Sequence, residues 1–266
     1  MIEVCGVSKS FGDTKILDDI SLTVAKGERV SILGPGSCGK SVLLKLILGL
    51  EEVSTGSVSL LDQNIDQADE IEKRKILQRV GVAFQQGGLF DFMTVEENIM
   101  FALKHMTEFT EDKAREIIDG LLEQVKLPHT KSMYPYELSG GMKRRIGIAR
   151  ALATAPDIAI FDEPTSGLDP VTSTIILNMI GELGDERPES SLIVSTSSVE
   201  VAIRFASRII LMRDGRIVSD GKWQEMIVGE DKWITNFLGT RLIGIDISYA
   251  RELKLPEKFI AKHWQT

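Results

Sequence analysis

The sequence predicts an α/β fold with a mainly parallel sheet at its centre. Three observations support this prediction. Predicted strands alternate with predicted helices after residue 158, the run at 158–161 is wholly apolar, as in a strand buried on both faces, and a glycine-rich loop at 34–41 separates a predicted strand from a predicted helix. With 266 residues and 43% apolar content, the chain can bury a full core in one large domain or two unequal lobes.

The N-terminal part is expected to consist mainly of strands. Apolar and polar side chains alternate in its first two segments, which a turn at 10–13 joins. Charged residues dominate 62–79, which indicates a loop with a short helix. The expected elements are strands at 2–8, 16–25, 30–33, 57–61 and 79–84, the last ending at Gln85, and a helix at 42–48.

From about 86 to 155 the pattern becomes helical. Thr110 is expected to cap a helix whose first turn holds Glu111 and Asp112. One face of that helix is apolar at helical spacing, through Ala114, Ile117, Ile118, Leu121, Leu122 and Val125. A second helix is expected to begin at Ser139 and to run to Ala153, because Pro156 then ends it.

The remainder of the chain alternates strand and helix. The buried strand at 158–161 ends in Asp162, Glu163 and Pro164. The elements expected after it are a helix at 171–184, a strand at 192–195, a helix at 199–205, and strands at 208–213 and 216–219. The tail at 241–266 carries no motif, and we expect either a short docking arm or partial disorder.

The glycine-rich loop has the full pattern G-x-x-x-x-G-K-[ST], in the strand, loop and helix context that a phosphate-binding loop requires. Its glycines allow the backbone to wrap around a polyphosphate, and its N–H groups and the following helix N-terminus attract negative charge. Lys40 is expected to reach the β- and γ-phosphates, and the Ser41 hydroxyl to ligate Mg²⁺. A mere glycine turn that happens to carry a lysine is the alternative. The loop comprises Gly34, Pro35, Gly36, Ser37, Cys38, Gly39, Lys40 and Ser41, and Val42 opens the helix.

Two carboxylates follow the buried strand, where open α/β sheets bind their ligands. Asp162 is expected to hold the metal, through water. Glu163 is placed to orient and polarise a water for in-line attack on the γ-phosphorus. An Asp-Glu pair after an apolar run is common by itself, but with the phosphate-binding loop upstream it indicates ATP hydrolysis.

Composition limits the class of protein. The net charge of −8 argues against a general nucleic-acid surface. The only cysteines are Cys5 and Cys38, and because Cys38 lies in the loop, no disulfide is expected, which fits a reducing cytosol. Cys38 is either a redox-sensitive thiol or a small tolerated residue. No secretory leader and no apolar run of membrane-spanning length is expected. If the protein acts at a membrane, we therefore expect it to bind there as a peripheral partner.

A third motif identifies a family. Leu138-Ser139-Gly140-Gly141-Met142 precedes the basic run Lys143-Arg144-Arg145, and it resembles the signature sequence of ABC ATPases. Gln85, the Phe161-Asp162-Glu163-Pro164-Thr165 stretch and Ser166-Gly167-Leu168-Asp169 resemble the Q-loop, Walker B and D-loop of that family, in its order. The resemblance covers about 1–240. It implies an antiparallel β subdomain, an inserted helical subdomain at about 86–155, and a C-terminal extension at 241–266.

The resemblance also implies a head-to-tail dimer. Ser139, Gly140 and Gly141 of one subunit would close over the γ-phosphate held by the Lys40 loop of a second copy, so that two ATP molecules hold the dimer and hydrolysis releases it. Structurally, the same Ser-Gly-Gly turn is a capped helix N-terminus, which offers N–H groups and a dipole to an anion. Gln85 joins Ser41 and Asp162 as a metal ligand, and Asp169 contributes to nucleotide binding. Phe11 either stacks on the adenine or is a core side chain.

One position departs from the family pattern. Members usually carry a histidine that contacts the γ-phosphate after the strand at 192–195, whereas this chain reads Ser195-Thr196-Ser197-Ser198. An ungapped alignment places Ser197 there, with Thr196 one residue away as the alternative. A hydroxyl can donate one hydrogen bond but carries no imidazolium charge. We therefore expect retained ATP binding and reduced or differently coupled hydrolysis, and an inactive subunit is the alternative.

The stretches at 84–90, 93–99 and 169–173 resemble the ATPases of Mla/Mce-type lipid transporters. This implies phospholipid transport with an integral membrane permease and an Mce-type substrate-binding protein, at the cytoplasmic face of the inner membrane. Importers of amino acids or metals share much of the pattern and are the alternative. Phe90, Phe92 and Met93 either line the groove for a permease helix or belong to the core. The tail would clasp the neighbouring subunit.

Two other classes of function remain open. A soluble ABC clamp for DNA repair or ribosomes usually joins two cassettes or splits one around a coiled coil, whereas this chain has one uninterrupted acidic cassette. A binding-only switch would dimerise on ATP without hydrolysing it. Phosphate release by the wild type and by Glu163→Gln separates this switch from an ATPase.

Overall fold

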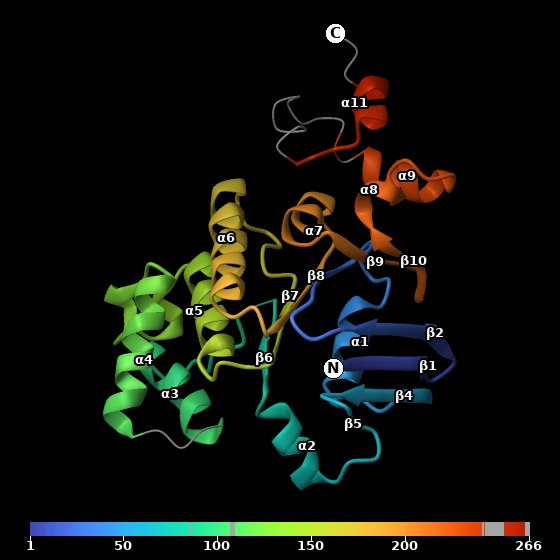
Figure 1. The fold of residues 1–266 in the computed structure, drawn as a ribbon. Coiled ribbons are helices and arrows are strands. Elements are labelled where there is room, and N and C mark those ends of the chain that lie inside the picture. The colour runs from blue at the N-terminus through green and yellow to red at the C-terminus, as the bar shows by residue number, and fades with distance from the viewer. Residues whose placement is uncertain (86, 107–109, 241, 243–252, 264–266) are drawn as a thin grey trace.

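Two β-sheets and the helices around them form the fold (Figure 1). The computed structural model describes residues 1–85, 87–106, 110–240, 242 and 253–263. The six-stranded sheet has the order β10-β9-β3-β8-β7-β6, in which β9, β3, β8, β7 and β6 are parallel and β10 is antiparallel to β9. The four-stranded sheet, β2-β1-β4-β5, is antiparallel. The predicted α/β class with a mainly parallel sheet is therefore confirmed.

The strands are β1 (Ile2–Phe11), β2 (Thr14–Val24), β3 (Arg29–Leu33), β4 (Thr55–Leu60), β5 (Gln63–Asn64), β6 (Val80–Ala83), β7 (Ile158–Asp162), β8 (Ser191–Thr196), β9 (Arg208–Arg213) and β10 (Arg216–Lys222). The helices are α1 (Lys40–Ile47), α2 (Glu70–Leu77), α3 (Val95–Met106), α4 (Glu111–Gln124), α5 (Gly140–Leu152), α6 (Pro170–Glu186), α7 (Val199–Phe205), α8 (Trp223–Met226), α9 (Lys232–Gly239) and α11 (Glu257–His263). Short 3-10 turns occupy Pro128–Thr130 and Pro135–Glu137.

Side chains of β7 show how the parallel sheet is covered on both faces. Ile158 and Ile160 pack with α1 and the antiparallel sheet, whereas Ala159 and Phe161 pack with the helices α3 to α6. Alternate residues of a strand point to opposite faces, so an apolar run without alternation is what a doubly covered strand requires. Figure 1 shows α3, α4 and α5 beside the β6 edge, and α8, α9 and α11 beyond β9 and β10.

Most predicted elements agree with the structure to within one to three residues. The side chain of Thr110 caps α4 and that of Ser139 caps α5, as predicted. The turn at 10–13 was predicted too long, because β1 continues to Phe11 and β2 begins at Thr14, so that only Gly12 and Asp13 form the turn. Cross-strand pairing of Phe11 with Thr14 extends the hairpin beyond the alternating pattern.

Four of the described helices were not predicted individually, and one of them, α11, lies in the tail. α3 lies in the segment that was predicted to be helical only as a whole, and α8 and α9 lie at 223–239, for which no element was predicted. α9 had a signal: Asp231 caps it, and Ile234 and Leu238 are buried at helical spacing. In the tail, Leu255, Phe259 and Ile260 pack with α8 and α9 of the same chain. The rest of the predicted extension, 243–252 and 264–266, lies outside the described residues, as does 241.

Within the part of the chain that the structure describes, no helix has the length and apolarity needed to cross a bilayer.

Gly81 tests the contact that joins the helical segment to the sheet. A Cβ at this position of β6 would lie 1.9 Å from the backbone oxygen of Ala151 in α5. We expect Gly81→Ala to lower the free energy of unfolding by about 1–3 kcal/mol, because α5 must shift away from β6. Denaturant titration measures this change.

Gly120→Ala is the matched control. Gly120 lies within the exposed face of α4, and its added Cβ would meet nothing within 4 Å. We expect this variant to be stabilised by about 0.5–1 kcal/mol, because alanine loses less backbone entropy in a helix. Equal stability of the Gly81→Ala protein and the wild type would contradict the close packing of α5 on β6.

Candidate functional site: a phosphate-binding loop and two carboxylates

The loop between β3 and α1 is closely packed. A Cβ on Gly34 would lie 2.5 Å from the Met212 carbonyl oxygen, and one on Gly39, which has φ +103°, would lie 2.5 Å from the Leu17 side chain. Gly34 also donates its N–H to the Thr196 carbonyl at 3.3 Å, which ties the loop to β8. Glycine is therefore required at both positions, by close approach at Gly34 and by close approach and backbone conformation at Gly39.

The rest of the loop faces outward. Gly36 and Ser37 are exposed, and Ser37 adopts a left-handed φ of 62°. Ser41 is exposed on the first turn of α1, while Val42 is half-buried and packs against the core under the antiparallel sheet. The N-terminal turn of α1 thus presents its N–H groups and the Ser41 hydroxyl at the mouth of the loop.

Lys40 lies inside the loop and only 6% of it is exposed. Its ammonium donates to the carbonyl oxygens of Gly34 at 3.0 Å and Pro35 at 3.1 Å. The same ammonium lies 3.6 Å from a carboxylate oxygen of Glu163, which is distant in the sequence. The structure therefore brings Lys40 and Glu163 together, as both predicted roles require.

Cys38 is buried in the loop, and burial raises the pKa of its thiol although the nearby Lys40 ammonium acts in the opposite direction. A raised pKa leaves less thiolate at neutral pH, and the thiolate is the reactive form. The structure favours the interpretation of Cys38 as a small tolerated residue over that of a redox-sensitive thiol.

Asp162 and Glu163 lie at the carboxyl end of β7, next to the end of β8. The Ser195 hydroxyl donates to Oδ1 of Asp162, and the Glu163 N–H donates to the Ser195 carbonyl at 3.0 Å. Glu163 has a left-handed φ of 47°, which turns its side chain away from the strand direction. A non-glycine residue in this conformation is strained, and the neighbouring strand holds it there.

The oxygen donors here suit Mg²⁺. This ion prefers hard oxygen ligands and usually takes one or two from the protein, with the rest from phosphates and water. Asp162 offers a carboxylate, and Ser41 a hydroxyl at the start of α1. The described residues contain no group of three or more His, Cys, Asp or Glu side chains that would hold a metal alone. The set therefore fits a cation that arrives together with a nucleotide.

Gln85 follows β6 and is exposed. Its side-chain amide donates to the Ser166 hydroxyl at 3.3 Å, and its backbone carbonyl accepts from Nε of Arg144 at 2.9 Å. Ser166 in turn donates its N–H to the Glu163 carbonyl. Gln85 therefore contacts the loop that follows the two carboxylates.

Ser197 and Thr196 both line a cavity of about 340 Å³ that Glu163, Ser166, Gly167 and Leu168 also line. Thr196 is almost fully buried, and its hydroxyl accepts from the Ser198 N–H at 3.1 Å. Ser197 is half-buried beside this cavity. The geometry therefore favours Ser197 over Thr196 as the residue nearer to a ligand.

Ser139 does not join this cluster within one chain. It caps α5, and its hydroxyl accepts from the Met142 N–H at 3.2 Å, with Gly140 exposed beside it. α5 packs on β6, three strands from β3, which corresponds to about 14 Å across the sheet. Ser139 also precedes the Ala151 contact by about 18 Å along the helix. The turn is thus separated from the Lys40 loop of the same chain.

Asp169 lies near the Ser139 turn rather than inside the Lys40 loop. It caps α6, accepts from the backbone and hydroxyl of Thr172, and these bonds lower the pKa of its carboxyl. A Cβ on Gly141 would lie 3.1 Å from the Thr172 side chain. The signature turn and the start of α6 therefore adjoin each other.

Phe11 is 47% exposed at the end of β1, so the alternative that it is a core side chain is wrong. The Lys9 ammonium lies 4.9 Å from the centre of its ring and also contacts the Glu52 carbonyl and the Glu51 carboxylate. Lys9 was not predicted as a residue of the site. Its ammonium contacts both the Phe11 ring and the segment after α1.

Sequence reasoning also missed Ser195 and Arg144. Ser195 interrupts an apolar strand with a hydroxyl, and Arg144 was noted only as part of a basic run. A polar residue inside a buried strand is the signal that would have identified Ser195, because buried polar groups require partners.

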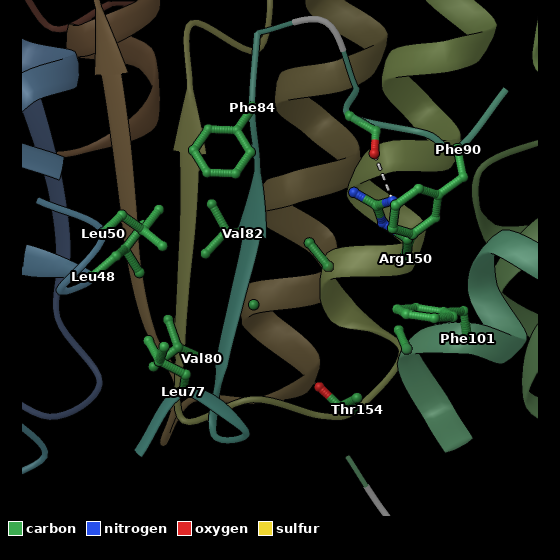
Figure 2. A pocket seen from close by; sticks show the side chains of 14 residues that line it. Leu48, Leu50, Leu77, Val80, Val82, Phe84, Phe90, Phe101, Arg150 and Thr154 are labelled. Atoms are coloured by element: carbon green, nitrogen blue, oxygen red, sulfur yellow. Dashed lines mark hydrogen bonds between the residues drawn. The ribbon is translucent and has the colours of Figure 1, made fainter. Parts of the chain in front are cut away.

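An apolar groove lies beside Gln85 (Figure 2). Phe84 of the segment after β6, Leu50 after α1 and Phe101 of α3 lie around it, each at least 39% exposed. Arg150 of α5 donates to the Gly88 carbonyl at 2.7 Å beneath Phe90. Phe90 lines the groove and Phe92 is 76% exposed next to its ring, so the core alternative is wrong for Phe92. Met93 is half-buried.

Comparisons with known proteins support a single family. A family description, ABC transporter, matches residues 17–166. The glutamine transport ATP-binding protein GlnQ of Escherichia coli is 39% identical over 85% of this chain and 93% of its own length. The arginine transport ATP-binding protein ArtM of Bacillus subtilis is 38% identical over 86% and 94%. A methionine import ATP-binding protein, MetN 2 of Bacillus cereus, is 40% identical over 77% of this chain and 60% of its own length.

Solved structures agree. The ATP-binding cassette MJ0796, as a dimer in a post-hydrolysis state bound to ADP and Pi, has a TM-score of 0.75 at 31% identity, over 84% of this chain and 98% of its own. CbiO1 of Clostridium perfringens has a TM-score of 0.76 at 25% identity, over 95% and 98%. The predicted P-loop ABC ATPase fold is confirmed.

GlnQ, ArtM and MetN 2 are named for the transport of glutamine, arginine and methionine. These names do not support the predicted Mla/Mce type of transporter. The phosphate-binding loop, the paired carboxylates and the signature turn agree with the family match over more than half of the chain. The chain belongs to the ABC transporter family, as an ATP-binding subunit that hydrolyses ATP.

Proposed function

We propose that this chain is the ATP-hydrolysing subunit of an ABC importer for an amino acid, and that it works with a separate membrane permease. The observation that carries the substrate class is the identity of 38–39% over more than nine-tenths of the length of relatives named for glutamine and arginine transport. The geometry of the site supports ATP hydrolysis, and the groove beside Gln85 supports binding to a permease.

Residues of the loop hold the triphosphate. Lys40, which contacts the loop carbonyls of Gly34 and Pro35, exchanges these partners for β- and γ-phosphate oxygens. The N–H groups of the loop and the start of α1 surround the phosphates, and the exposed ring of Phe11 stacks on the adenine. Val42 supports the base side of the site from the first turn of α1.

Ser41, Asp162 and Gln85 hold Mg²⁺ with the nucleotide. When bound, the ion neutralises developing charge on the phosphate oxygens. Asp162 is oriented by Ser195, and Gln85 is held at its backbone by Arg144. The bond from Gln85 to Ser166 uses the amide nitrogen, so the amide oxygen of Gln85 remains available to the ion.

Glu163 orients and polarises the attacking water. Its side chain is 14% exposed, lies beside Lys40 and borders the cavity that Ser197 also lines, so a water can reach it there. Ser197 lines the cavity next to Glu163. It donates a hydrogen bond to the γ-phosphate in place of the histidine that is usual in the family. A neutral donor stabilises less developing charge than an imidazolium, so we expect slower hydrolysis than in relatives with histidine.

A second copy completes the site. Ser139 caps α5, whose first residues are Gly140 and Gly141, and α5 packs on β6, three strands from the strand that precedes the Lys40 loop. A head-to-tail arrangement places this turn over the γ-phosphate of the partner, with Asp169 at the junction. The similar MJ0796 cassette is a dimer in its ADP and Pi state, which supports this arrangement.

The groove in Figure 2 is the docking surface for a permease helix. It is apolar, it is bordered by exposed Phe84, Phe101 and Leu50, and it adjoins the Gln85 segment. An amphipathic helix fits such a surface through its apolar face. This docking places the chain at the cytoplasmic face of a membrane as a peripheral subunit.

A phospholipid transporter of the Mla/Mce type, with an Mce-type binding protein, is the second candidate. Its supporting observation is the resemblance of the three stretches at 84–90, 93–99 and 169–173. Purifying the chain with its native permease and measuring ATPase stimulation by amino acids and by phospholipid vesicles distinguishes the two. Stimulation by phospholipid alone would overturn the amino-acid proposal.

Glu163→Gln tests hydrolysis and dimer formation together. We expect phosphate release to fall about 100-fold or more, because glutamine cannot take the proton of the attacking water. At saturating Mg-ATP the variant should form dimers in size-exclusion chromatography with light scattering. Equal phosphate release by variant and wild type would indicate a binding-only switch, and a monomeric variant, both alone and with its permease, would contradict the head-to-tail arrangement.

Ser197→His tests the departure from the family pattern. We expect turnover to rise about tenfold or more with ATP affinity changed less, because an imidazolium adds charge at the γ-phosphate. Thr196→Ala is the comparison, since Thr196 faces the backbone of Ser198 and not the ligand. Unchanged turnover in the Ser197→His protein would count against the assignment of Ser197.

Leu50→Asp tests the groove. Leu50 is 56% exposed, so the substitution should leave the fold intact while placing a charge where an apolar helix docks. We expect co-purification of the permease to fall about fivefold or more, as measured by quantitative mass spectrometry. Val218→Asp is the control, on exposed β10 at the sheet edge opposite to β6. Equal recovery of the permease with both variants would contradict docking in this groove.

A further inference from the structure

Ser195 is a polar residue within the most buried part of the parallel sheet. It has no exposed surface, and it lies in β8 between β3 and β7. Its neighbours in the strand, Ile193 and Val194, are apolar and buried. A hydroxyl at such a position is costly unless it has a partner.

The partner of this hydroxyl is the carboxylate of Asp162. In the parallel pairing of β7 with β8, Asp162 lies directly opposite Ser195. The Ser195 hydroxyl donates to Oδ1 of Asp162, whose side chain is itself almost fully buried. The hydrogen bond therefore engages Oδ1 of Asp162 and leaves Oδ2 as the oxygen that this bond does not use.

The backbone of Ser195 acts on the next residue after Asp162. Its carbonyl accepts the N–H of Glu163 at 3.0 Å, and Glu163 has the left-handed φ of 47°. Any residue at 195 would supply this carbonyl, whereas only a hydroxyl supplies the bond to Asp162. The side chain and the backbone of Ser195 thus have separable effects, and a substitution removes only the first.

The two hydroxyls that come next in the chain have other positions. Thr196 accepts from the Ser198 N–H, and Ser197 borders the cavity beside Glu163. Among these three successive hydroxyls, Ser195 is the one that lies opposite Asp162 in the sheet and donates to its carboxylate.

We propose that Ser195 is a positioning residue that orients Asp162 for the divalent cation of the bound nucleotide; this inference rests on the proposed role of Asp162. Carboxylates that ligate metals are held by hydrogen bonds of this kind, and loss of such a partner typically weakens metal affinity about 10–100-fold. Ser195 does not contact the metal, the nucleotide or the attacking water.

Ser195→Val tests the inference through binding rather than through turnover. The dissociation constant of a fluorescent ATP analogue is measured in Mn²⁺ and in EDTA, and the ratio of the two constants gives the contribution of the metal. We expect this ratio to shrink about 10–100-fold in Ser195→Val, with the constant in EDTA unchanged within about twofold. Ser195→Thr, which keeps the hydroxyl, should restore most of the ratio.

Ser31→Val is the matched control, because Ser31 is an equally buried serine of neighbouring β3 whose hydroxyl donates to the Ala202 carbonyl instead. It should keep the wild-type ratio. Ser195→Ala carries the test if the valine variant does not fold.

A wild-type ratio in folded Ser195→Val or Ser195→Ala, an equal loss in Ser31→Val, or failure of Ser195→Thr to restore the ratio would overturn the inference. If the wild type itself binds the analogue equally in Mn²⁺ and EDTA, the metal site of the proposed function fails as well. The two failures are therefore distinguishable.

Discussion

The meeting of three parallel strands at their carboxyl ends is the constraint on which the site depends. β3, β8 and β7 are neighbours, and two backbone hydrogen bonds tie the segments after β3 and β7 to β8: Gly34 to the Thr196 carbonyl and Glu163 to the Ser195 carbonyl. Lys40 and Glu163, which are distant in sequence, come within 3.6 Å because of this arrangement. Neither the loop nor the carboxylates would be aligned without β8 between them.

The described residues include two helix N-termini that lie apart in the fold and have the same physical character. The start of α1 and the start of α5 are both helix N-termini preceded by small residues, and both attract anions. Because α5 packs on β6 at the sheet edge, its N-terminus lies beyond the reach of the Lys40 loop of the same chain. In a symmetric pair of copies, the start of α5 of each copy could meet the Lys40 loop of the other.

The segment after β6 lies between the loop that follows the two carboxylates and the groove. Gln85 contacts Ser166, Arg144 contacts the Gln85 carbonyl, and Arg150 contacts the carbonyls of Gly87 and Gly88. Phe84 and Phe90 flank these bonds and border the groove of Figure 2. Two arginines of α5 therefore bind backbone carbonyls of a segment that contacts both the loop after the carboxylates and the groove.

The sequence by itself determined the α/β class, the loop from Gly34 to Ser41, the carboxylates after β7 and the capped start at Ser139. Each of these depends on local pattern, because buried strands are apolar, phosphate-binding loops need glycine, and helix caps need a side-chain oxygen. Only the tertiary structure decided that Phe11 is exposed, that Ser197 is more exposed than Thr196, that α9 and the tail pack together, and that Ser195 donates to Asp162. Those features arise from strand register and from contacts between residues distant in sequence, which local pattern does not encode.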